Sequence, residues 1–203
     1  NVVNVYYLSD KGGQEGVADE YEVEFKYTAG ENGTVEALEG GATSEWHTVK
    51  VVELNADGTV KSETTVPANP LAKVKAEGKT GYAFTNWTDE SGNVYADTAE
   101  IQEGSFAEAK TFTANFEILS NLSYEVHYFY DGTENDDEKV VVNGTATFGT
   151  PIPYDMTSPK EHNGTAYVLG RVEKSGDGTV TTVEANNVVN VYYLSDKGGQ
   201  EGV

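Results

Sequence analysis

The sequence predicts a β-rich protein, all-β to α+β, built from two small sheet modules in tandem with little or no helix. Apolar and polar residues alternate with a period of two at residues 21–27 and again at residues 124–130, as expected for half-buried strands. Turn dipeptides such as Asp57-Gly58 and Asp177-Gly178 separate further runs rich in β-branched residues. That pattern is typical of hairpins.

The first seventeen residues, NVVNVYYLSDKGGQEGV, are identical to residues 187–203. The separation of the copies is far longer than the period of a solenoid or propeller. The copy includes the glycine-rich stretch KGGQEGV, which has nothing to pack. Packing gives no reason for every residue of such a stretch to be the same in both copies, so the identity indicates a tandem duplication. We therefore expect one period of a longer polymer plus an overlap. Residues 1–19 would then be the closing strand of a preceding repeat and a linker.

The first module is expected over residues 20–118. Its opening strand would be Tyr21–Tyr27, and turn signals follow at Asn32-Gly33, Asp57-Gly58 and Ser91-Gly92. Residues 69–84 are ambiguous, because Asn69-Pro70 could start a helix. Alternation of Ala72, Val74 and Ala76 with charged residues favours a strand instead.

The second module is expected over residues 119–203. Tyr124–Tyr130 would open it, a hairpin would turn at Asn143-Gly144, and Asn187–Leu194 would close the module. Three prolines make the middle of this module its least regular stretch, with room for one helical turn: Pro151, Pro153 and Pro159.

Acidic residues outnumber basic ones by 34 to 13, which gives a net charge of −21. Such a surface repels phosphate backbones and anionic lipid, so we expect no nucleic acid partner and no direct membrane contact. The chain has no cysteine, which excludes disulfides, thiolate zinc sites and cysteine nucleophiles.

Three stretches of the first module, NGTVEA, AKVKAEGKTGYAFTNWTD and TFTANFE, resemble the divergent internalin-type B-repeat of bacterial surface proteins. The resemblance covers about Tyr21 to Glu117. In the second module YEVHYFYDG, GTATFGTPI and NNVVNVYYL resemble the mucin-binding-protein repeat, roughly Ser123 to Leu194. The central EHNGTAYVLGRVEK departs from that family, since it lacks a Gly-Tyr pair. The resemblance implies that the closing strand Asn187–Leu194 pairs near the opening strand Tyr124–Tyr130.

These resemblances imply β-grasp-like modules arrayed in tandem in an adhesin stalk, on the cell wall of a Gram-positive bacterium. The expected function is a structural repeat unit of a long extracellular stalk or fibre that projects or links other domains. Its partners would be identical neighbouring repeats of the same polymer. The alternative is an adhesin module that binds host glycans or mucin.

No enzyme, cofactor or metal site is expected. The three histidines, His47, His127 and His162, lie far apart in unrelated contexts, and no hydrolase or metalloprotease motif is present. The acidic stretch Asp131–Glu138 could attract calcium, but it lacks the alternation and terminal glutamate of an EF-hand. A solvated hairpin loop is the favoured interpretation.

Trp46 and Trp87 could form a sugar-stacking platform, although core packing beside Phe84 is favoured for Trp87. Lys26 and Asn115 are the natural candidates for an isopeptide bond. The alternation of their neighbours sends both side chains to solvent, which argues against that bond. The NGT sequences fit the N-glycosylation pattern, but they are interpreted as tight turns at Asn32, Asn143 and Asn163.

Overall fold

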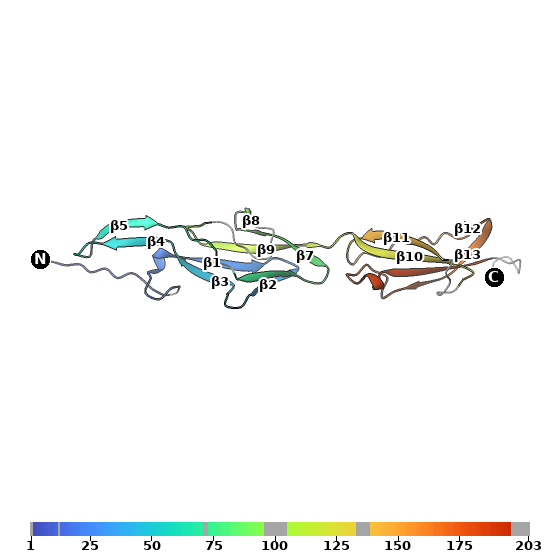
Figure 1. Cartoon of the computed structure of the whole chain (residues 1–203), viewed down its shortest axis with the longest axis horizontal. Helices are drawn as coiled ribbons and strands as arrows, with labels where there is room; N and C mark the ends of the chain where they lie inside the picture. The colour runs from blue at the N-terminus through green and yellow to red at the C-terminus, as the bar shows by residue number, and fades with distance from the viewer. Residues whose placement is uncertain (1, 12, 71–72, 96–104, 133–138, 196–203) are drawn as a thin grey trace. The chain divides into compact units, whose positions relative to one another are not determined.

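The computed structural model describes residues 2–11, 13–70, 73–95, 105–132 and 139–195. The chain divides into two compact units, Asn1–Glu117 (unit 1) and Ile118–Val203 (unit 2). Strands dominate both units, and the described residues contain two short 3-10 segments and no α-helix (Figure 1). The prediction of a β-rich protein with little or no helix is confirmed.

Unit 1 is built on a five-stranded sheet with the order β3-β1-β9-β7-β8. Its strands are β1 (Glu22–Ala29), β3 (Ser44–Thr48), β7 (Tyr82–Thr88), β8 (Val94–Tyr95) and β9 (Lys110–Ile118). The first and last strands, β1 and β9, lie side by side and run parallel, with Phe25 opposite Lys110. β3 flanks β1 on the outer side as an antiparallel neighbour.

A second, two-stranded sheet contributes to the core of unit 1. It pairs β2 (Gly33–Ala37) with β6 (Val74–Gly78), so residues 74–78 of the ambiguous stretch form a strand, as predicted. Residues 71–72 of that stretch, Ala72 among them, lie outside the described residues. The buried cluster takes side chains from both sheets: Phe25, Tyr27, Val74, Ala76, Trp87, Phe112 and Ala114. The Asn32-Gly33 turn exists, with Asn32 at a φ of 66°, but the hairpin that it predicts is wrong. β2 leaves β1 after the turn and pairs with β6, which places Val74 and Ala76 in the core.

β4 (Lys50–Leu54) and β5 (Val60–Thr65) form a separate two-stranded ribbon (Figure 1). The predicted Asp57-Gly58 turn joins them, with Gly58 in the left-handed region at a φ of 82°. The side chains of Leu54 and Val60 are exposed, although they face each other across the ribbon.

Unit 2 repeats the same arrangement of its terminal strands. Its sheet has the order β11-β10-β14-β13-β12. The strands are β10 (Leu122–Tyr130), β11 (Val140–Ala146), β12 (Lys160–His162), β13 (Thr165–Lys174) and β14 (Val188–Ser195). β14 pairs in parallel with β10, from Glu125 opposite Val188 to Tyr130 opposite Tyr193. The predicted pairing of the closing strand with the opening strand is therefore confirmed.

An irregular segment covers one face of this sheet. Residues 148–152 run against residues 178–180, where Ile152 N donates to Gly178 O and Val180 N to Thr150 O. Ile152 and Val180 pack with the sheet residues in the core of the unit. The proline-rich stretch from Pro151 to Pro159 contains no helical turn. A two-residue turn at Asn163-Gly164 joins β12 to β13, with both φ angles positive.

The predicted hairpin turn at Asn143-Gly144 is wrong, because both residues lie inside β11. Gly144 sits directly opposite Tyr124 in the ladder. A Cβ atom at this position would lie 2.3 Å from the tyrosine ring. Gly144 is therefore required because the Tyr124 ring of the neighbouring strand leaves no room for a side chain, and not because the chain turns there.

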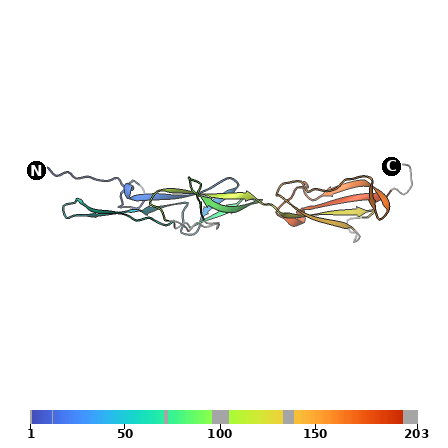
Figure 2. The same cartoon turned by 90° about the horizontal axis from the view of Figure 1, so that it is seen from above.

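The N-terminal segment has two parts. Residues 2–8 form no strand, and in both views they run toward the same end of unit 1 as the β4–β5 ribbon (Figure 1, Figure 2). The following glycine-rich stretch folds back on the unit as a cap. Within this stretch the Ser9 hydroxyl donates a hydrogen bond to the Asp19 carboxylate. Two bonds join it to the strands: Gln14 N donates to the Glu22 carboxylate at 2.8 Å, and Thr48 Oγ1 donates to the Gln14 side-chain oxygen at 2.7 Å. The prediction that this stretch has nothing to pack against is wrong.

Candidate functional site

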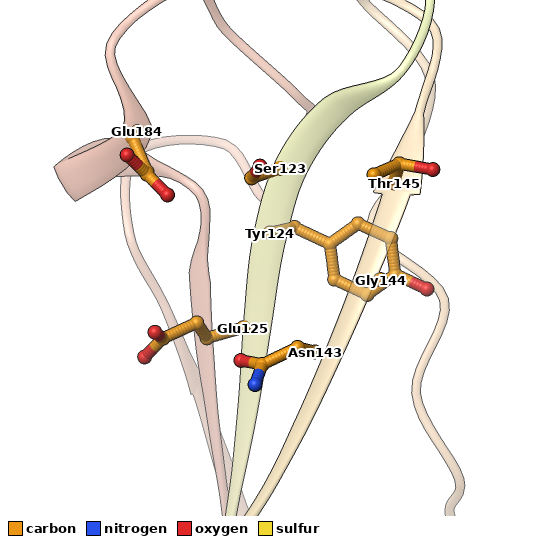
Figure 3. A pocket seen from close by; sticks show the side chains of 7 residues that line it. All are labelled: Ser123, Tyr124, Glu125, Asn143, Gly144, Thr145 and Glu184. Atoms are coloured by element: carbon orange, nitrogen blue, oxygen red, sulfur yellow. The ribbon is translucent and has the colours of Figure 1, made fainter.

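A surface depression lies in unit 2, over the start of β10 and the middle of β11 (Figure 3). Its volume is about 490 Å³, and it is open to solvent. The Tyr124 ring lies over Gly144, while the carboxylates of Glu125 and Glu184 lie to the other side of β10. The rest of the depression is lined by hydroxyl and amide groups, from Ser123, Thr145 and Asn143. These groups can donate and accept hydrogen bonds.

The three histidines lie on separate strands and in different surroundings. His47 lies against the Phe25 ring in unit 1, with ring centroids 5.2 Å apart. His127 is half-buried and contacts Glu125 at 2.7 Å. His162 stacks on Tyr130, with centroids 3.9 Å apart. Each imidazole therefore has a local packing or hydrogen-bonding role.

The two tryptophans lie in different environments, and the sequence predicts the environment of one of them, Trp87. Trp87 is fully buried in the core of unit 1, beside Phe84, so its predicted core role is confirmed. Trp46 lies on β3 with more than a third of its surface exposed. The two do not form a joint platform: one is inside the core and the other on the surface.

The structure does not bring Lys26 and Asn115 together. Lys26 pairs with Glu24 at 3.0 Å and is exposed, as predicted. Asn115 was expected in solvent, but it is partly buried and donates to Asn86 and Thr88 on the neighbouring strand. In the ladder the residue opposite Lys26 is Thr111, four positions from Asn115.

Most of the acidic stretch that could attract calcium, Asp131–Glu138, lies outside the described residues, which leave out residues 133–138. Asp131, at its start, accepts a hydrogen bond from Ser195 N at 2.7 Å. Over the described ranges, no group of three or more histidine and carboxylate side chains is placed to hold a metal ion.

A buried carboxylate organises the loop between β7 and β8, and sequence reasoning missed it. Asp89 accepts five hydrogen bonds at 2.8–2.9 Å, from Lys110 Nζ, the Tyr95 hydroxyl, both nitrogens of Asn93 and the Ser91 amide. Its side chain is fully buried. The charge of Lys110 and the Asn93 donors hold the pKa of Asp89 well below its usual range. The local signal was the Asp-x-Ser-Gly-Asn sequence, which is typical of an Asx turn.

We expect acid to destabilise unit 1 through Asp89. Because its pKa is lowered by folding, the unfolded chain binds more protons between the two pKa values. The stabilisation is present above the unfolded pKa and is lost progressively as the pH falls below about 5. Denaturant titrations at pH 3 to 7, followed by the fluorescence of the two tryptophans in unit 1, measure the loss. The Asp89→Asn variant should show a flatter pH dependence over this range, and an unchanged slope would contradict the assignment.

An equivalent anchor in unit 2 ties the irregular stretch to the sheet. Lys160 lies over the Tyr128 ring at 4.4 Å and pairs with Asp155 at 2.9 Å. Hydrogen bonds from Thr157 and the nearby lysine lower the pKa of Asp155. The Tyr193 hydroxyl donates to the carbonyl of Thr157 at 3.0 Å. These contacts fix backbone that lacks regular structure, so they are structural.

Comparison with known families finds a match for part of the first unit. Residues 47–120 match the family model of the divergent InlB B-repeat domain. This B-repeat-like region runs from within β3 to just beyond β9, which supports the resemblance inferred for the first module. It is compatible with a repeat unit of a surface protein. The comparison with curated proteins finds no relative of the chain. No helix among the described residues is long and apolar enough to cross a membrane.

Proposed function

We propose that this chain is a load-bearing repeat unit of an extracellular stalk on a bacterial, Gram-positive cell wall. It projects or links other domains, joins identical neighbouring repeats and catalyses no reaction. The B-repeat-like region in unit 1 supports a surface repeat. The net charge of −21 supports solubility of a long polymer through mutual repulsion.

One observation carries the proposal: in each unit the first and last strands are parallel neighbours. These pairs are β1 with β9 and β10 with β14. When the chain is pulled from its two ends, such neighbours are drawn lengthwise in opposite directions. All the hydrogen bonds between the two strands then share the load and must break together. An antiparallel terminal pair would instead open one bond at a time.

Single-molecule stretching of the whole chain from its ends tests this function. We expect two high-force unfolding events. An extended residue spans about 3.4 Å, and the folded end-to-end length of each unit, set by its terminal strands, is about 30 Å. After subtraction of that folded length, complete extension of residues 22–118 and of residues 122–195 gives length gains of roughly 300 Å and roughly 220 Å. The two steps can thus be assigned to the two units.

The control changes only the direction of the load on unit 1. The chain has no native cysteine, so Glu31→Cys and Glu117→Cys supply unique attachment points. Both positions lie beyond the same end of the β1–β9 ladder, whose last described pair is Ala29 with Ala114. Force between them opens the ladder bond by bond, and we expect unfolding at a several-fold lower force. Equal forces in the two geometries would refute the load-bearing proposal.

Glycan binding is a second candidate, favoured by the depression beside Tyr124. An aromatic ring edged by hydroxyl, amide and carboxylate groups suits sugar recognition. A glycan array with the whole chain and with the Asn143→Ala variant tests it. Saturable binding that the substitution weakens would support an adhesin. Binding that is unaffected by the substitution would exclude this depression as the site.

A further inference from the structure

The chain carries one eight-residue sequence in two opposite environments. Residues 1–8 and residues 187–194 are identical. The second copy forms nearly all of β14, whereas residues 2–8 form no strand. The side chains of Val5 and Tyr7 are 67 % and 91 % exposed, while their counterparts Val191 and Tyr193 are fully buried.

The position of β14 defines a socket for this sequence. β14 lies between β10, its parallel neighbour, and β13, its antiparallel neighbour, so both of its edges are paired. Val189, Val191 and Tyr193 contribute to the core of unit 2. Asn187, at the start of the strand, is buried and bonds to Ser123 and Thr181.

An exposed apolar segment of this kind favours pairing with a sheet. Residues 2–8 can make every hydrogen bond and side-chain contact that residues 188–194 of β14 make with the socket, because the two sequences are the same. The difference is the tether: β14 is attached to its own socket, which gives it an effective concentration of about 1 mM. A neighbouring chain competes when chains are crowded or when β14 is weakened.

We propose that residues 2–8 of one chain insert between β10 and β13 of a second copy, in the place of β14. Each chain would donate a strand near its N-terminus and accept one in unit 2. Such a head-to-tail contact leaves a free strand on one end chain and a free socket on the other, so assemblies of more than two chains can form. This inference goes beyond the proposed function, since a covalent load-bearing stalk needs no exchange between chains.

The test uses the full chain with β14 weakened by Val189→Asp and Val191→Asp. At about 1 mM chain, near the effective concentration of a tethered strand, we expect light scattering to give masses of two chains or more. We expect hydrogen exchange to show amides of β10 protected by more than about 100-fold relative to an unfolded unit.

The matched control adds the equivalent substitutions Val3→Asp and Val5→Asp to the same chain. It should keep the mass of one chain and lose the protection of β10. A synthetic peptide of sequence NVVNVYYLSD, added to the β14-weakened chain, should fill the socket, restore protection and reduce the mass to one chain plus one peptide. A scrambled peptide should do neither.

Three results would overturn the proposal. The β14-weakened chain could remain at one-chain mass with β10 unprotected, which means that residues 2–8 do not fit the socket. It could remain at one-chain mass with β10 protected, which means that the strand serves its own chain. The control with all four substitutions could associate equally, which means that the association does not use the duplicated sequence.

Discussion

Replacing Phe112 with alanine is expected to lower the free energy of unfolding of unit 1 by about 3–5 kcal/mol. The ring is fully buried on β9. It stacks on Tyr27, with centroids 5.6 Å apart, and meets Tyr95 edge-on at 5.3 Å. Further rings lie around it, so the neighbours cannot collapse into the space. The cost therefore includes a cavity as well as the lost burial.

Tryptophan fluorescence measures this effect selectively, because Trp46 and Trp87 both lie in unit 1. A loss of this size should lower the melting temperature of unit 1 by more than about 10 °C. Val94→Ala is the matched control, since Val94 lies in the same unit but is exposed; it should change stability by less than about 0.5 kcal/mol. A Phe112→Ala effect no larger than that of the control would contradict the assigned core.

Asn187→Ala is expected to destabilise unit 2 by about 2–4 kcal/mol, because it leaves several buried polar groups without partners. The side-chain oxygen accepts from Thr181 N at 2.7 Å, and the side-chain nitrogen donates to the carbonyls of Ser123 and Thr181 at 2.9 Å. The residue is almost fully buried. Chemical unfolding followed by near-UV circular dichroism of the tyrosines measures the change.

Asn190→Ala provides the comparison for this prediction. Asn190 lies on β14, three residues after Asn187. Its side-chain oxygen is buried without a hydrogen-bond partner among the described residues. Removing it should therefore cost less than removing Asn187. Equal losses for the two variants would indicate that side-chain volume, and not the hydrogen-bond set, determines the stability at the start of β14.

The sequence predicts most of the strands and fails on part of their pairing. The alternation in Tyr21–Tyr27 and Tyr124–Tyr130 predicts a strand with one solvent-exposed face and one buried face, which is a local property of the chain. The structure has strands at both places. Asp57-Gly58 joins two strands that pair with each other. Asn32-Gly33 has the same turn chemistry, yet the following strand pairs with β6. Burial in the core decides that pairing, and a dipeptide carries no information about it.

The candidate site shows the same division. Isolated histidines and a buried Trp87 could be inferred from local context. The Asp89 network could not, because Lys110 reaches it from a strand 21 residues later in the chain. Gly144 was misinterpreted for a related reason: the Tyr124 ring that requires it lies on the neighbouring strand. The resemblance of the second module to a mucin-binding repeat stays a prediction.

The cap formed by the glycine-rich stretch changes how the duplicated seventeen residues can vary over generations. Gly13 has a φ of 91°, and a Cβ atom there would lie 1.9 Å from the Glu22 carboxylate, so a larger residue would displace the cap. The first eight residues of the same sequence are constrained as the central strand of unit 2. In the tandem array that we propose, one short sequence would serve the module before it and the module after it. A mutation anywhere along it would then be exposed to selection through one fold or the other, which would leave little of it free to drift.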